Sequence, residues 1–358
     1  MEKETTKKEK KPKVKKPKQK IKGFTIAVIL ADLLAVVLLV VIYGPWSGFR
    51  NFWVTTAMTT MRHQYLAYML YSPETINDIM SQNYIKTIDE EVNLDDIVIG
   101  NTGEQDSYSS IYEQQILERE EGNDIYKIIR INEDGYKGYL TVIYDPKNVD
   151  LAVPTKLGVV GQSVATMCRL NNGLVGINGG GFQDLDGWGN GSTPYGAIIK
   201  DGKLVWDYYG GNGGLIGFTN EHKLWLTYDE PDVAIEKGMR DAVEFGPFLI
   251  VNGKASEVHG DGGWGIAPRT VIAQRKDGIV LFLVIEGRLP GYSTGASMSD
   301  VIKLLSRYKA YNAANLDGGA STTMAVNGRL YNKPSAGAEY GGRAVSNAWI
   351  VVDRSKDE

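Results

Sequence analysis

The chain has 358 residues, of which 43% are hydrophobic and 23% are charged, a composition that excludes a protein disordered throughout. Its charge is uneven: residues 1–22 contain eleven Lys and three Glu, whereas the remainder contains 28 Lys and Arg against 40 Asp and Glu. Cys168 is the only cysteine, which excludes an internal disulfide and a cysteine-ligated zinc site.

Residues 23–43 are an apolar stretch in which Asp32 is the only charge, long enough to cross a bilayer core of about 30 Å. We expect an uncleaved membrane-spanning signal anchor. A cleaved signal peptide is the alternative. The apolar stretch of a signal peptide is, however, shorter than residues 23–43, and a cleavage site with small residues follows it. The basic tail, residues 1–22, then predicts a cytoplasmic N-terminus, a single pass through the cell membrane, and residues 44–358 outside the cell. An extracellular domain without disulfides favours a bacterial surface.

The basic tail lies directly before the apolar stretch, so it is explained as a topology signal. We therefore expect no nucleic-acid partner. Residues 44–122 predict an extracellular helical stalk and linker. Two amphipathic helices are expected between residues 52 and 83, the second beginning at Ser72 with Pro73 in its first position. An acidic, turn-rich linker follows and ends near Gly122.

From residue 123 to residue 354 we expect the catalytic domain. Strand-like runs separated by Gly, Asn and Asp turns predominate there, and helical patterns are confined mainly to residues 163–172 and 297–310. This balance predicts the α+β class: a large mixed or antiparallel sheet with packed helices, preceded by one transmembrane helix and a helical stalk.

Glycine-bearing polar segments interrupt these strands at four places. They are "GINGGGFQD" (176–184), "APRTVIA" (267–273), "IEGRLPGYSTGAS" (285–297), and "ANLDGGASTTMAV" (314–326) with "GRAVSNAWIVV" (342–352) behind it. Loops on a rigid sheet are the usual places for functional sites, because glycines let a ligand approach the backbone and the strands fix the side chains.

Between Ile125 and Asp353 the chain resembles the phosphodiester glycosidases. The resemblance rests on six motifs in a fixed order: "NGGGF", "GPFLIVNGK", "PRT", "EGR", "LDGGAST" and "RAVSNA". The resemblance implies hydrolysis of a sugar-1-phosphodiester. Three positions depart from the family's pattern: Glu286 replaces a common Asp, Ala320 a third glycine, and Ala267 a frequent His.

Hydrolysis at the anomeric carbon expels a phosphate monoester, so the site must bind anionic charge and stabilise an oxocarbenium-like sugar. Asp317 and Glu286 each follow an apolar strand and are the predicted catalytic carboxylates, with their individual roles left open. Arg269, Arg288 and Arg343 are expected to bind phosphate, because a guanidinium suits bidentate contact. The other predicted substrate-binding residues are Asn178, Gly179, Gly180, Thr270, Gly318, Gly319, Ser321, Thr322 and Asn347.

No cofactor is required by this chemistry. A divalent cation, calcium or magnesium, is the one cofactor for which the sequence offers ligands, namely Asp184, Asp186, Asp317 and backbone carbonyls. The expected partners are an anionic glycan or sugar-phosphodiester substrate and, through residues 23–43, the membrane.

Three functions follow from these patterns. The favoured one is a membrane-anchored extracellular glycosidase that acts on glycosyl-1-phosphodiesters of a surface glycopolymer or exopolysaccharide. The alternatives are a surface protein that binds phosphoglycans without cleaving them, which the departures at Glu286 and Ala267 motivate, and a metal-dependent phosphodiesterase on the same fold.

Overall fold

The computed structural model describes residues 23–60, 63–100, 107–184, 189–208, 213–338 and 341–356. The chain divides into two compact units, residues 1–50 and residues 51–358. In the first unit, α1 (Gly23–Tyr43) is the one helix among the described residues that is long and apolar enough to cross a membrane. The basic tail, residues 1–22, lies outside the described residues.

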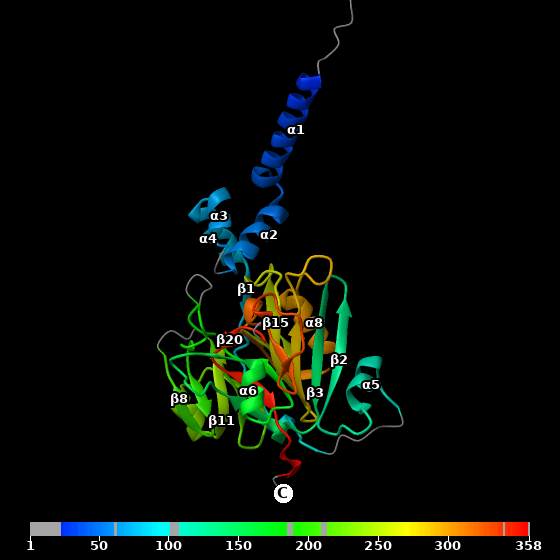
Figure 1. Ribbon diagram of the computed structural model, residues 1–358, viewed down its shortest axis with the longest axis vertical. Helices are drawn as coiled ribbons and strands as arrows, with labels where there is room; N and C mark the ends of the chain where they lie inside the picture. Colours follow the sequence, from blue (N-terminus) through cyan, green and yellow to red (C-terminus); the bar gives the residue numbers. More distant parts are fainter. Residues whose placement is uncertain are drawn as a thin grey trace, which may run out of the picture. The chain divides into compact units, whose positions relative to one another are not determined.

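The second unit belongs to the α+β class, as predicted, and its paired strands are antiparallel (Figure 1). It contains three larger sheets instead of one. The seven-stranded sheet has the order β13 (Lys254–Ala255), β12 (Phe248–Val251), β17 (Ala310–Leu316), β15 (Arg269–Arg275), β16 (Val280–Ile285), β3 (Tyr136–Ile143) and β2 (Tyr126–Glu133).

The other two larger sheets have five strands each. One has the order β10 (Leu224–Thr227), β9 (Gly214–Thr219), β11 (Met239–Phe245), β7 (Ile198–Lys200) and β8 (Lys203–Trp206). The other has the order β19 (Arg329–Leu330), β18 (Met324–Val326), β6 (Val175–Asn178), β21 (Ala348–Val351) and β4 (Val149–Ala152). Two small sheets pair β1 (Tyr84–Lys86) with β14 (Glu257–His259), and β20 (Ala344–Val345) with β5 (Gln162–Ser163).

One apolar core joins the three larger sheets. Phe282 on β16, Phe218 on β9 and Trp349 on β21 are all fully buried in it. The rings of Phe218 and Trp349 meet edge to face with their centroids 5.5 Å apart, an arrangement that aromatic pairs favour. All six residues of β16 are buried, so this strand is apolar on both faces and its sequence shows no alternation.

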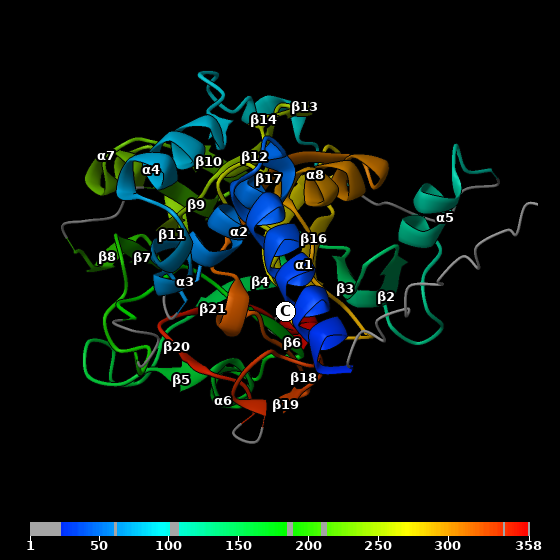
Figure 2. The same cartoon turned by 90° about the horizontal axis from the view of Figure 1, so that it is seen from above.

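The helices of this unit cover the sheets. They are α2 (Ser47–Met58), which begins in the first unit, α3 (Tyr65–Leu70), α4 (Pro73–Gln82), α5 (Ile111–Leu117), α6 (Val164–Leu170), α7 (Pro231–Glu236) and α8 (Met298–Arg307). The predicted helices at 163–172 and 297–310 are confirmed as α6 and α8. A capping box formed by Ser297 and Asp300 fixes the start of α8, which packs on β12 and β17 (Figure 2).

Parts of the segment expected to be a stalk and linker pack with the sheets. Ser72 caps α4 as predicted, and the strand that follows, β1, pairs with β14. Ile116 and Leu117 of α5 belong to the core on one side of the seven-stranded sheet. The compact unit that contains the sheets therefore begins at Asn51, because described residues before 123, such as Ile76, Ile97 and Ile116, are buried in it.

Candidate active site

The glycine-bearing segments meet around one pocket, with a volume of about 730 Å³, which we call the central pocket. Its charged residues are Asp184, Arg269, Arg288, Asp317 and Arg343. Asp317 follows β17, Arg269 begins β15 and Arg343 precedes β20. Strand ends of different sheets thus bring together side chains that lie far apart in the sequence, as the sequence analysis expected of these loops.

Asp317 is the predicted catalytic residue that lies in the central pocket. Its burial raises the pKa of the carboxyl to about 6, although a hydrogen bond from Ser321 and the charge of Arg343 act to lower it. The main chain of Asp317 is held on both sides: its N–H donates to Gly179 O at 3.0 Å, and its carbonyl accepts from Asn178 Nδ2 at 2.6 Å. A carboxyl with a pKa near neutrality in a pocket is suited to acid–base or nucleophilic work.

Asn178 is fully buried and its amide is occupied by the protein itself. Besides the donation to Asp317, its Oδ1 accepts from Thr270 Oγ1 at 2.8 Å and from the Thr323 N–H at 3.0 Å. Asn178 and Thr270 therefore lie behind the pocket, outside its lining, where they fix the backbone that carries Asp317.

The three glycines after Asn178 allow close packing of backbone and side chains. A Cβ on Gly179 would lie 2.1 Å from Asn347 Oδ1, the same atom that accepts from the Gly180 N–H at 2.7 Å. Gly179, Gly180 and Asn347 support the site from outside the pocket lining, whereas Gly181 lines the pocket. The structure thus places the predicted binding residues Gly179, Gly180 and Asn347 behind the pocket and their neighbour Gly181 in its lining.

Gly318, Gly319 and Ser321, three of the predicted substrate-binding residues, line the central pocket. Gly319 has a φ of 59°, which favours glycine, and a Cβ there would lie 3.4 Å from the guanidinium of Arg288. Thr322 is buried and does not belong to the lining.

Arg269 is a buried guanidinium at the pocket wall, only 3% exposed. Its Nε donates to Ala296 O at 3.0 Å, and its Nη2 donates to Trp264 O and Gly265 O at 2.8 and 2.5 Å. Burial, followed by the charge of Arg288, lowers its pKa to about 10, so it remains cationic at neutral pH. The structure records no ion pair between Arg269 and a described carboxylate, which leaves this charge available to an anion.

Arg288 and Arg343 complete the cationic lining. Desolvation lowers the pKa of Arg288, whose hydrogen bonds with the described protein are confined to its main chain. Arg343 differs, because its Nη2 donates to Asp184 Oδ1 and its guanidinium lies 4.8 Å from the centre of the Phe182 ring. Two cations, Arg269 and Arg288, are therefore the stronger candidates for phosphate contact.

Glu286, the second predicted catalytic carboxylate, lies outside the lining of the central pocket. It is 1% exposed, its Oε1 accepts from the Lys333 N–H, and a hydrogen bond from Tyr292 to Glu286 raises the pKa of Tyr292. The structure thus ties Glu286 to the loop around residue 333, whereas the second carboxylate that shares the pocket with Asp317 is Asp184.

Sequence reasoning did not single out two groups of lining residues. Four aromatic residues, Phe182, Tyr195, Phe245 and Trp264, provide apolar faces of the kind on which sugar rings pack. Thr59, Thr60 and His63 enter the lining from the segment after α2. For Trp264 the available signal was the Gly-Gly-Trp-Gly run of residues 262–265, which interrupts the strand pattern without belonging to any of the four segments.

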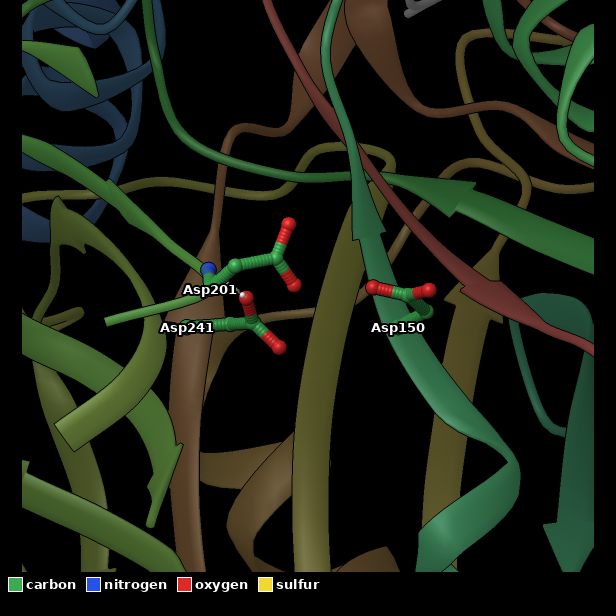
Figure 3. Close-up of side chains that lie close together, drawn as sticks. All are labelled: Asp150, Asp201 and Asp241. Atoms are coloured by element: carbon green, nitrogen blue, oxygen red, sulfur yellow. Dashed lines mark hydrogen bonds between the residues drawn. The ribbon is translucent and has the colours of Figure 1, made fainter. Parts of the chain in front are cut away.

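Ligands for a cation occur in two places. In the central pocket, Asp184 and Asp317 are present, but Asp184 is paired with Arg343, and Asp186 lies outside the described residues. Elsewhere, Asp150, Asp201 and Asp241 bring carboxylate oxygens within 4.8 Å of one another (Figure 3). Lys200, Arg240 and Arg354 pair with this cluster and supply one positive charge for each carboxylate, so it is balanced by the protein's own charges.

Residues 171–352, just over half of the chain, match the sequence profile of the phosphodiester glycosidases, and the chain belongs to that family. The SPbeta prophage-derived uncharacterized protein YomE of Bacillus subtilis (strain 168) is 30% identical over 188 residues. That match covers 50% of this chain but only 28% of YomE.

The solved structures that resemble this chain include the following two. The zebrafish N-acetylglucosamine-1-phosphodiester alpha-N-acetylglucosaminidase catalytic domain, auto-inhibited by its pro-peptide, is 24% identical with a TM-score of 0.54, covering 66% of this chain and 86% of that one. A hypothetical protein from Synechocystis is 17% identical with a TM-score of 0.44, covering 63% of this chain and 61% of the other. The zebrafish likeness confirms the fold.

Proposed function

We propose that the chain is a hydrolase that cleaves glycosyl-1-phosphodiesters at the bond between the anomeric carbon and the phosphate oxygen. The observation that supports this proposal is that Asp317 shares one pocket with Arg269 and Arg288. The described protein does not neutralise the positive charges of these two arginines. Family membership supports the same reaction class. The substrate is an anionic glycan in which a sugar is linked through phosphate to a second group.

The charges of the pocket suit the two halves of such a substrate. Arg269 and Arg288 bind the phosphate oxygens and stabilise the charge that builds up as the C–O bond breaks. Asp317 acts at the anomeric carbon, where a carboxylate stabilises the developing positive charge. Water adds its oxygen to that carbon, the electron pair of the broken bond leaves with the phosphate monoester, and a proton from the water is released.

Hydrolysis in ¹⁸O-labelled water tests this reaction. We expect the label in the sugar, because water attacks carbon. Label in the phosphate would identify a phosphodiesterase that cleaves the P–O bond. Binding of the diester without any product would indicate a phosphoglycan-binding protein, and either result would overturn the proposal.

We also propose that α1 anchors the protein in the cell membrane with the N-terminus in the cytoplasm and the catalytic unit outside. The apolar length of α1 and the eleven Lys of residues 1–22 support this orientation. Its substrate would then belong to a surface glycopolymer or exopolysaccharide.

Protease added to intact cells should digest the catalytic unit and leave a small membrane fragment. Recovery of the whole domain in the medium would show a cleaved signal peptide instead.

A further inference from the structure

One wall of the central pocket comes from outside the region that matches the family. Thr59, Thr60 and His63 follow α2 and form what we call the N-terminal wall. None of them was predicted as a site residue. Their segment belongs to the same compact unit as the sheets, so the pocket of this unit includes them.

A glycine-rich loop, residues 259–265, lies beside the segment that contains Thr59 and Asn83. β1 pairs with β14 just before this loop, and Asn83 Oδ1 accepts from the Asp261 N–H at 2.9 Å. Gly260 has a φ of 60°, and a Cβ there would lie only 2.1 Å from Asn83 Oδ1. Gly265 makes the corresponding approach to α2, because its Cβ position lies 3.2 Å from Thr59 Oγ1.

The same loop supports the phosphate-binding side of the pocket. The carbonyls of Trp264 and Gly265 accept hydrogen bonds from Arg269, so Gly265, which lies beside Thr59, also holds the guanidinium. By contrast, Asp317 is influenced by Arg343 and Asp184. The N-terminal wall therefore adjoins the loop that holds Arg269, the residue to which we assign the phosphate.

The hydroxyl oxygens of Thr59 and Thr60 can accept hydrogen bonds from a ligand. Thr59 Oγ1 donates to Thr56 O at 3.1 Å, and Thr60 Oγ1 donates to Ala57 O at 2.9 Å. Each hydroxyl has a single hydrogen, so what remains for a ligand is acceptor capacity. A phosphate or carboxylate oxygen has no hydrogen to offer such acceptors, whereas the hydroxyl of a sugar or polyol does.

We propose that the N-terminal wall binds the second ester group of the substrate, and that this group is a hydroxyl-rich alcohol, a sugar or polyol joined to the phosphate. The inference rests on the proposed function, since it places the phosphate at Arg269 and the hydrolysed sugar at Asp317. The N-terminal wall thereby determines which phosphodiesters are accepted, while the family motifs carry out the hydrolysis.

The test compares two diesters with the same glycosyl phosphate, one esterified to glycerol and the other to methanol. Thr60→Val removes the hydroxyl at nearly constant size, and His63→Ala removes the imidazole. We expect each variant to lower kcat/KM for the glycerol diester by about 3- to 10-fold, the worth of one hydrogen bond, and to leave the methyl diester within about 2-fold. Thr75→Val on α4, away from the pocket lining, is the matched control and should change neither.

Equal losses on both diesters, or no loss on either, would overturn the proposal, as would a loss that appears only with a long-chain alkyl diester. Calorimetric binding of the same two diesters in the Asp317→Asn background separates this proposal from the proposed function. If the wild type hydrolyses neither diester, selective loss of glycerol-diester affinity in Thr60→Val still supports the N-terminal wall. Unchanged affinity in that experiment, or the absence of binding, would contradict it.

Discussion

Asp317→Asn is expected to lower kcat by about 10²- to 10⁴-fold, the usual contribution of a positioned catalytic carboxyl. The change keeps the shape of the side chain but removes a negative charge from a pocket that binds an anion, so substrate affinity should be kept or increased. Steady-state kinetics and calorimetric binding measure the two effects separately. Asp232→Asn makes the same chemical change at an exposed position of α7 and should leave both unchanged.

The same variant should be more stable than the wild type at neutral pH. Burial raises the pKa of Asp317 from its ordinary value near 3.8 to about 6. The protonated form therefore stabilises the fold fully below about pH 4, and that contribution is lost as the pH rises through 6. An asparagine cannot ionise, so the difference in unfolding free energy should grow between pH 4 and pH 7 to roughly 3 kcal/mol in favour of the variant.

Thermal melts across this pH range measure the difference, and the rates of the wild type should change with an apparent pKa near 6. Near-normal turnover by a well-folded Asp317→Asn protein would remove Asp317 from the mechanism. Because Asp184 is the other carboxylate that lines the pocket, the catalytic role would then be sought there and not at Glu286.

The sequence indicated which residues at the strand ends lie together in the central pocket, and their role there stays a prediction. Asp317, Arg269 and Arg343 each stand where an apolar run meets a glycine-bearing loop, and neighbouring strand ends meet at one edge. Glu286 shows the limit of this reasoning. It also follows an apolar strand, but that strand ends at Ile285, and Arg288 two residues after Glu286 has a φ of 58°. Arg288 lines the central pocket, whereas Glu286 accepts from the Lys333 N–H outside it.

The N-terminal wall could not be derived in the same way. Its position depends on contacts between residues far apart in the chain, such as Asn83 with Asp261, for which no local pattern gives a signal. The amphipathic pattern of residues 52–83 predicted two helices, and among the described residues the structure has α2, α3 and α4 there instead, with only the start of α4 placed as predicted. The pattern also gave no signal for the surface that covers their apolar faces. For the same reason the pattern of strands predicted one large mixed or antiparallel sheet, whereas the division into three larger sheets emerged only from the structure.

Arg269→Lys is expected to weaken phosphate binding and slow hydrolysis together. A lysine keeps the positive charge but has one donor group instead of a planar fork, so it cannot hold Ala296 O, Trp264 O and Gly265 O and still present a donor to the phosphate. The loss of a charged hydrogen bond costs on the order of 1.5 to 3 kcal/mol, which corresponds to about 10- to 150-fold in kcat/KM. The kinetics of diester hydrolysis measure the loss in kcat/KM, and calorimetry with the phosphate monoester product measures the loss in phosphate binding.

Arg275→Lys is the matched control, because Arg275 lies at the other end of β15 and is equally buried. Its guanidinium pairs with Asp277 and donates to Tyr308 O, and it does not line the central pocket. Both variants lose buried guanidinium contacts, so both should melt at lower temperature, but only Arg269→Lys should lose affinity for the phosphate monoester. Equal affinities in the two variants would mean that Arg269 supports the 259–265 loop without binding phosphate, and Arg288 would then be the remaining cation for that role.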